Sequence, residues 1–224
     1  MLQDFEAIIL DMNATFMFGH DRFGDHENYG EFFREIGGTL PKEKASDIVR
    51  DVFAFLAPKY PDPMFRECFP SIRAALDAVV PAGAVSETDL SLLVDTFAYH
   101  ERGTVSPEYA DTLSDLASTH AIGLVADIWA PRDTWLTEFE RAGIKNHFRA
   151  MSFSSDHGIV KPSPKPFQQI LQALGSPPHK TVVIGDSVRR DLGGATAAGL
   201  ACILVGGAQD ESAVCSIDSL LCVR

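Results

Sequence analysis

Cysteine is scarce in this chain of 224 residues, with only four occurrences. They are Cys68, Cys202, Cys215 and Cys222, and they form neither a Cys-x-x-Cys motif nor a cluster with histidines at zinc spacing. This pattern argues against a disulfide framework or a zinc site, and it favours a chain kept reduced in the cytoplasm. We therefore predict structural thiols that pack as small apolar side chains, and a cytoplasmic location.

Basic residues are also few, since 19 lysines and arginines accompany 31 aspartates and glutamates. The formal charge of −12 and the pI near 4.9 leave no concentrated cationic surface for a nucleic-acid backbone. We therefore expect no nucleic-acid partner. A small anion can still bind where a lysine or a metal ion reverses the local field.

Long apolar runs are missing as well. Residues 192–208 carry no charged side chain, but five glycines divide them, and the stretch is shorter than the roughly 20 apolar residues that a membrane span requires. Asp4 and Glu6 stand where a secretory signal would carry basic residues. We predict neither export nor a membrane partner, and the hydrophobic content of 46% is sufficient for a buried core.

A long helical segment is predicted between the first two strands. The first strand is expected over residues 5–10, and the next clear buried strand only over residues 121–125. Between them, apolar side chains recur at helical spacing within residues 29–36, 45–56, 72–79 and 90–97, with Ser71 and Ser86 at capping positions. Four helices without an intervening strand indicate an all-helical domain inserted at residues 19–102.

Helices and strands alternate in the rest of the chain. Helices are expected over residues 107–117, 131–143 and 163–175, and strands over residues 121–125, 181–184 and 201–205. Strands that are apolar throughout and are joined by helices form parallel sheets covered on both faces. The predicted fold is α/β, a Rossmann-like parallel sheet core built from residues 1–18 and 103–224.

Charged side chains stand at the expected carboxyl ends of these strands or in the adjoining loops. Asp11 ends the first strand, Asp127 follows the second, Lys161 precedes a proline-rich helix start, and Asp186 follows the strand of residues 181–184. Such positions converge on one crevice in a parallel sheet. Asp11 is the candidate nucleophile, Asp11 and Asp186 are candidate ligands of Mg²⁺, and Lys161 supplies a fixed positive charge.

These residues resemble the haloacid dehalogenase superfamily, most of whose members are phosphatases, and the resemblance covers nearly the whole chain. That family has a nucleophilic aspartate after strand one, a lysine before a proline-rich helix start and a Gly-Asp-Ser-x-x-x-Asp signature. Asp11, Lys161, Asp186 and Asp191 match it, and residues 193–199 resemble its small-residue helix. The resemblance implies that the inserted domain is an all-helical cap domain that covers the site and selects the substrate.

The resemblance also implies the roles of the remaining site residues. It predicts Mg²⁺ bound by Asp11, Asp186 and the backbone carbonyl of Asn13, with Asp191 and Ser187 supporting these ligands. Asp11, Asn13 and Lys161 are the expected catalytic positions. Ala126, Asp127 and Lys161 are the expected substrate-binding positions.

Two positions depart from the family pattern. Phosphatases of the family carry an acid two residues after the nucleophile, which protonates the leaving group and later deprotonates water, whereas Asn13 can do neither. Ala126 stands where the family has a hydroxyl that holds the phosphate, and Asp127 follows where a neutral amide is common. Asp127 either caps the turn before Trp129 or contacts the substrate.

Several polar and aromatic residues near the first strand and in the insertion need no catalytic role. The group His20, Asp21, Arg22 and His26 follows the first strand closely, and we expect it at the surface rather than in the crevice. The aromatic group Phe32, Phe33, Phe53 and Phe55 is expected to pack inside the cap.

Three functions remain open from the sequence. The first is a magnesium-dependent hydrolase of a small phosphorylated metabolite that uses an Asp11 phosphoenzyme and prefers leaving groups that need little protonation, such as aryl or acyl phosphates. The second is carbon–halogen or phosphonate cleavage, which branches of the same family perform without the second acid. The third is a catalytically degenerate protein that binds an anion or a partner. The substrate and the oligomeric state are not predicted.

Overall fold

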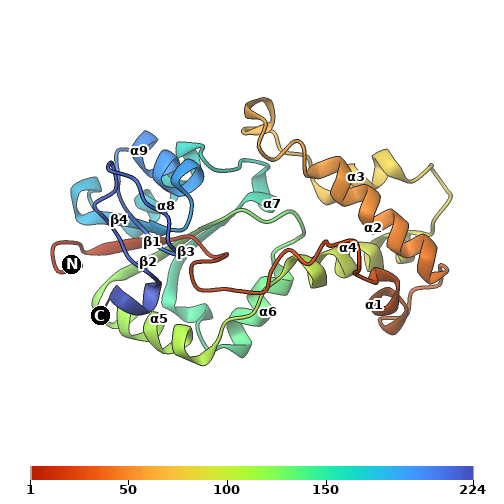
Figure 1. Cartoon of the computed structure of the whole chain (residues 1–224), viewed down its shortest axis with the longest axis horizontal. Helices are drawn as coiled ribbons and strands as arrows, with labels where there is room; N and C mark the ends of the chain where they lie inside the picture. The colour runs from red at the N-terminus through yellow and green to blue at the C-terminus, as the bar shows by residue number, and fades with distance from the viewer. Residues whose placement is uncertain (1, 224) are drawn as a thin grey trace.

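A six-stranded parallel sheet forms the centre of the protein, as seen in the computed structural model, which describes residues 2–223 (Figure 1). The strand order is β3-β2-β1-β4-β5-β6, and every pair of neighbours runs parallel. The strands are β1 (Ala7–Leu10), β2 (Ala121–Ala126), β3 (Phe148–Phe153), β4 (Thr181–Gly185), β5 (Ala201–Leu204) and β6 (Cys215–Ser216). The predicted α/β core is therefore confirmed.

Helices cover both faces of the sheet, so the side chains that point to either face of β1 are buried. Ile8 and Leu10 face α5 (Pro107–Thr119) and α6 (Asp133–Arg141) in one apolar core. Ala7 and Ile9 face α8 (Pro164–Leu174) and α9 (Gly193–Ala197) in a second core on the opposite side. Burial on both faces explains why the sequence of β1 is an uninterrupted apolar run.

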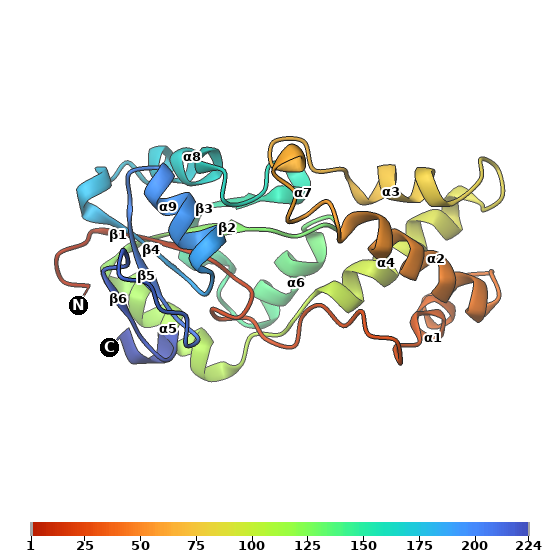
Figure 2. The ribbon, with the colours of Figure 1, turned by 45° about the horizontal axis from the view of Figure 1, so that its top comes forward.

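Four helices without a strand between them lie between β1 and α5, as predicted. They are α1 (Tyr29–Glu35), α2 (Lys42–Leu56), α3 (Ile72–Val79) and α4 (Glu87–Glu101), with a 3-10 turn at Pro63–Phe65. Ser71 and Ser86 cap α3 and α4 by accepting hydrogen bonds from the backbone N–H groups of Ala74 (3.2 Å) and Asp89 (3.1 Å). These helices pack together to one side of the sheet (Figures 1 and 2).

The two connections between this helical unit and the sheet lie side by side. Phe18 and Thr104 form an isolated antiparallel bridge, in which each backbone N–H donates to the other residue's carbonyl at 3.0 and 2.8 Å. This bridge lies at the predicted ends of the insertion, although the division of the chain at residues 18 and 103 stays a prediction.

Some elements differ from the expectations. Strand β3 was not predicted, because this edge strand carries an exposed Arg149 and a serine among its apolar residues. The two-residue β6 at the opposite edge was not predicted either. Further short helical segments are α7 (Ser154–His157), a π-helix at Val188–Leu192, and 3-10 turns at Lys145–His147, Pro178–Lys180 and Leu220–Val223. Among residues 2–223, no helix is long and apolar enough to span a membrane.

The four cysteines differ in burial. Cys202 lies buried on β5, Cys215 is partly buried, and Cys68 and Cys222 are exposed. Only Cys202 therefore behaves as a core side chain.

Candidate active site

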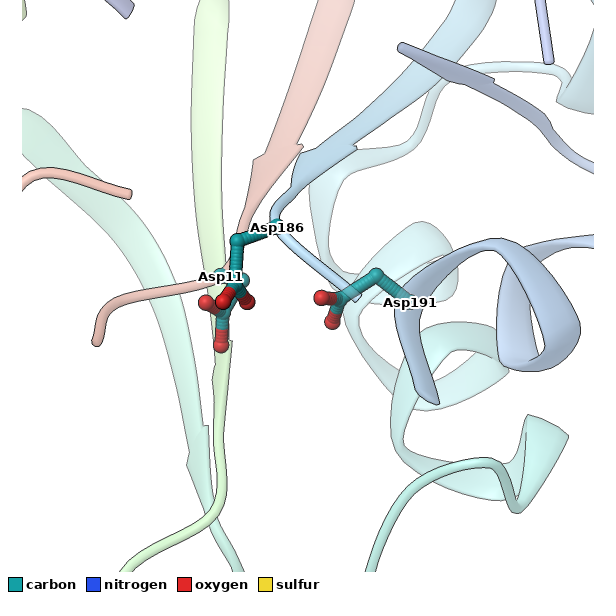
Figure 3. Close-up of side chains that lie close together, drawn as sticks. All are labelled: Asp11, Asp186 and Asp191. Carbon is teal, nitrogen blue, oxygen red and sulfur yellow. The ribbon is translucent and has the colours of Figure 1, made fainter. Parts of the chain in front are cut away.

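Three carboxylates meet at the carboxyl ends of the two central strands. Asp11 follows β1, Asp186 follows β4, and Asp191 lies in the π-helix that comes next (Figure 3). One carboxylate oxygen from each lies within 4.8 Å of the others. Adjacent parallel strands bring these residues together, although 175 positions separate the first two in the sequence.

Lys161 places its ammonium group between two of these acids. Its Nζ donates to Asp11 Oδ1 and, at 2.7 Å, to Asp191 Oδ1, and all three side chains are buried. Burial lowers the pKa of Lys161, but the charges of Asp11 and Asp191 outweigh it and hold this pKa well above its usual value. Lys161 therefore supplies a positive charge beside Asp11, the candidate nucleophile.

Further hydrogen bonds fix the orientation of these acids. Thr15 Oγ1 donates to Asp11 Oδ2 at 3.0 Å, and the backbone N–H of Ser187 donates to Asp191 Oδ2 at 3.0 Å. Gly185 is required beside them, since a Cβ there would lie 2.4 Å from Asp191 Cγ. Burial raises the pKa of Asp191 to about 7, against the opposing charge of Lys161.

The arrangement of Asp11 and Asp186 fits a hard divalent cation. Burial raises the pKa of Asp186, and the neighbouring Asp11 charge raises it further, because two carboxylates repel each other when no cation lies between them. The donor set consists of oxygens, as Mg²⁺ prefers. Asp11 and Asp191 each accept hydrogen bonds at both oxygens, whereas Asp186 accepts none from another described residue and is the carboxylate most available to such an ion.

Asp127 connects the inserted helices to Lys161. Tyr60, which follows α2, donates its hydroxyl to Asp127 Oδ2 at 2.8 Å, and the backbone N–H of Lys161 donates to both Asp127 oxygens at 3.1 and 3.3 Å. Burial raises the pKa of Asp127, while the Lys161 charge opposes this shift. Ala126 is buried as the last residue of β2, so its side chain offers no hydrogen bond.

A cavity of about 340 Å³ lies between the helical unit and these strand ends. Its walls are formed by acids, bases, an amide and aromatic side chains: Asp11, Asn13, His20, Asp21, Phe53, Ala57, Tyr60, Glu101, Asp127, Trp129, Lys161, Asp186 and Arg190. His20 and Asp21 both line this cavity; His20 is half-buried, whereas Asp21 and His26 are exposed, as predicted. Phe53 packs against Phe23 and Trp129, and it also lines the cavity.

Arg190, Tyr60 and Glu101 line the cavity but were missed from the sequence. The Arg190 guanidinium lies 5.0 Å from the centre of the Tyr60 ring, and the neighbouring Arg189 donates to the carbonyl of Pro61. An arginine pair within the Gly-Asp-Ser signature of an acidic chain was the available signal. Nothing local in the sequence directs Tyr60 or Glu101 toward the site.

The comparison with protein families gives one match over most of the chain. The family model described as haloacid dehalogenase-like hydrolase matches residues 4–199 of this chain. Among curated proteins, phosphoserine phosphatase of Thermus thermophilus is 28% identical over 133 residues, which cover 59% of this chain and 53% of that protein. The chain spans about half the length of the first curated relatives it matches.

Solved structures of both dehalogenases and phosphatases share the fold. A 2-haloacid dehalogenase from Pseudomonas syringae aligns with a TM-score of 0.64 and 22% identity, covering 97% of this chain and 95% of that one. A HAD phosphatase from Thermococcus onnurineus aligns with a TM-score of 0.62 and 18% identity, covering 96% and 94%. This likeness establishes the architecture and does not distinguish the two chemistries.

Proposed function

Because the chain belongs to the haloacid dehalogenase-like hydrolases, we propose that it is a magnesium-dependent phosphatase that acts on a small phosphorylated metabolite through a phosphoenzyme at Asp11. Several curated relatives are named phosphatases, among them the Thermus thermophilus protein and a glyceraldehyde 3-phosphate phosphatase of Methanothermobacter thermautotrophicus. These names support phosphate as the group transferred.

The contact that carries the proposal is the pair of Lys161 with Asp11, buried beside Asp186. A nucleophilic carboxylate needs an adjacent positive charge to approach a phosphate dianion, and Lys161 supplies it from a fixed position. An Asp11 oxygen attacks phosphorus, the bond to the leaving-group oxygen breaks, and an aspartyl phosphate forms. Thr15 and Asp191 hold the nucleophile and the lysine in place.

Asp11, Asp186 and the backbone carbonyl of Asn13 would hold Mg²⁺. When bound, the ion neutralises charge on the phosphoryl oxygens. The raised pKa of Asp186 is consistent with a site built for a cation, because the repulsion from Asp11 is relieved by a positive charge.

The cavity favours a leaving group with an apolar or aromatic surface. Phe53, Tyr60 and Trp129 form aromatic walls, and Asn13 provides no proton, so aryl phosphates fit both the shape and the chemistry. The hydrogen bonds from Tyr60 and the Lys161 backbone, together with the charges of Lys161 and Arg190, offset the negative charge of Asp127 in this cavity. With only a methyl side chain, Ala126 contributes through its backbone.

Isolation of the phosphoenzyme tests the proposal. The protein is mixed with 4-nitrophenyl phosphate and Mg²⁺, quenched in acid and digested, and mass spectrometry locates the phosphate. We expect phosphoaspartate at Asp11, none in Asp11→Asn, and loss of turnover with EDTA. Halide release from a 2-haloacid without phosphoenzyme would instead support dehalogenation, and absence of both reactions would support an anion-binding protein.

A further inference from the structure

Five carboxyl groups line the cavity, and hydrogen bonds from the protein already engage three of them. Lys161 and Thr15 donate to Asp11, and Tyr60 and the Lys161 backbone donate to Asp127. Glu101 accepts from the backbone N–H groups of Trp129 and Ala130 at 2.6 and 2.9 Å. Asp186 and Asp21 are the remaining two, and Asp186 faces Asp11 in the candidate metal site.

Asp21 keeps its carboxyl group available to a bound molecule. Within residues 2–223, no side chain or backbone N–H donates to it at hydrogen-bond distance, and 61% of its side-chain surface remains accessible. The nearest charged group is His20, whose Nε2 lies 3.8 Å from Asp21 Oδ2. This carboxyl is therefore free to exchange a proton with a ligand in the cavity.

The backbone holds Asp21 in an unusual conformation. Its φ is +55°, a left-handed value that few residues other than glycine adopt, although aspartate and asparagine tolerate it better than most. Its backbone N–H donates to the carbonyl of Glu101 at 3.1 Å, and the side chain of the next residue, Arg22, donates to the carbonyls of Gly19 (2.8 Å) and Arg102 (2.9 Å). Such strain persists where the surrounding structure fixes it, and it often marks functional positions.

The volume of the cavity brings Asp21 within reach of the reaction. About 340 Å³ lies near the lower end of the roughly 300–1,000 Å³ typical of small-molecule pockets. A molecule that fills this space with its phosphate at Asp11 also contacts the wall that carries Asp21. Asn13 lies on the same cavity without an ionisable group, and its Oδ1 is buried without a hydrogen-bond partner among the described residues.

We propose that Asp21 performs the proton transfers that Asn13 cannot, an inference that rests on the proposed phosphatase function. The protonated carboxyl of Asp21 gives its proton to the leaving-group oxygen as the bond from that oxygen to phosphorus breaks. The resulting carboxylate then accepts a proton from the water that attacks the aspartyl phosphate. Inorganic phosphate and the Asp11 carboxylate are released, and Asp21 is protonated again.

The groups that face Asp21 act on it in opposite directions. The cavity walls withdraw it from bulk water and raise its pKa, although much of its surface remains accessible, whereas the charges of His20 and Arg190 lower that pKa. Glu101 lies close enough for the charge of Asp21 to raise the pKa of the glutamate.

The test compares two leaving groups in Asp21→Asn, with Asp25→Asn in the same exposed loop as the matched control. Asparagine keeps the carboxyl shape and tolerates positive φ, so the loop conformation is retained. We expect hydrolysis of an alkyl phosphate to fall by roughly 10²–10⁴ and one limb of the pH profile of kcat/KM to disappear. Phosphoenzyme formation from 4-nitrophenyl phosphate should change little, because nitrophenolate leaves without a proton, but the phosphoenzyme should accumulate. Asn13→Asp should rescue alkyl phosphate turnover in the Asp21→Asn background.

The outcomes separate this inference from the proposed function. If the unaltered protein forms no phosphoenzyme and releases no phosphate, both fail. If it turns over but Asp21→Asn affects the two substrates equally, or affects neither, only the role of Asp21 is overturned. The same follows if Glu101→Gln, rather than Asp21→Asn, makes the rate depend on the leaving group.

Discussion

Tyr60 of the helical insertion donates a 2.8 Å hydrogen bond to Asp127, which follows β2, and Asp127 also accepts hydrogen bonds from the backbone of Lys161. These contacts connect the helical insertion to the segment that places the Lys161 charge beside Asp11. Arg190 over the Tyr60 ring strengthens the same junction, because a cation is attracted to the face of an aromatic ring.

Removal of the Tyr60 hydroxyl is expected to weaken this junction. Tyr60→Phe removes one of the two hydrogen-bond donors to Asp127 Oδ2, so we expect the free energy of unfolding to fall by about 1–2 kcal/mol and KM to rise. Urea denaturation and steady-state kinetics measure the two effects. Tyr99→Phe is the control, since the Tyr99 ring stacks on Phe32 and does not line the cavity. Equal stability of the two variants would contradict the importance of this contact.

Removal of the Lys161 charge should both destabilise the protein and abolish phosphoenzyme formation. Lys161→Met leaves Asp11 and Asp191 buried without their cation, and breaking a buried pair in this way typically costs about 3–5 kcal/mol. Lys165→Met removes an exposed lysine paired with Glu67, for which we expect a loss of about 0–1 kcal/mol. Denaturation curves in urea distinguish the two. A Lys161→Met variant as stable as the control would refute the buried pair.

Stability should decrease as the pH rises from about 4.5 to about 8. Burial raises the pKa of Glu101 to about 8, so the folded protein retains a proton that the unfolded chain has already lost in this interval. Its contribution to stability is complete below about pH 4.5 and lost above about pH 8, with a slope of at most about 1.4 kcal/mol per pH unit. Asp191 contributes in the same direction up to about pH 7.

Glu101→Gln should therefore flatten the dependence of the unfolding free energy on pH, measured by denaturation at a series of pH values. Glu43→Gln, which changes an exposed residue in the first turn of α2, serves as the control. An unchanged slope in Glu101→Gln would mean that another group titrates in this range.

Restoration of an acid two residues after Asp11 should accelerate catalysis when Asp21 is removed. Asn13→Asp places a carboxyl on the cavity wall beside Asp11, and in the Asp21→Asn background we expect it to raise turnover of alkyl phosphates by roughly 10²–10⁴. In the unaltered protein, where Asp21 supplies the acid, the gain should be small. Single-turnover decay of the phosphoenzyme measures the effect, and Asn146→Asp, in the remote turn at Lys145–His147, is the matched control. An equally large gain from Asn13→Asp in the unaltered protein would mean that no other residue supplies the acid.

The local elements of this fold were largely predictable because their signals lie in short stretches of sequence. The uninterrupted apolar run before Asp11 indicated a strand buried on both faces, and the serines at positions 71 and 86 marked true helix starts. Edge strand β3 was missed, since its exposed Arg149 and its serine break the apolar pattern that identifies central strands.

The sequence by itself determined which groups converge at the strand ends, because parallel strands bring their carboxyl ends to one side. That rule predicts that Asp11 and Asp186 lie together with Lys161 and Asp191 from the adjoining segments, and these four side chains meet in the structure. Only the tertiary structure decided which groups face them across the cavity. Tyr60, His20 and Asp21 are placed there by the packing of the helical insertion and by a left-handed turn, and neither arises from local periodicity or motif spacing.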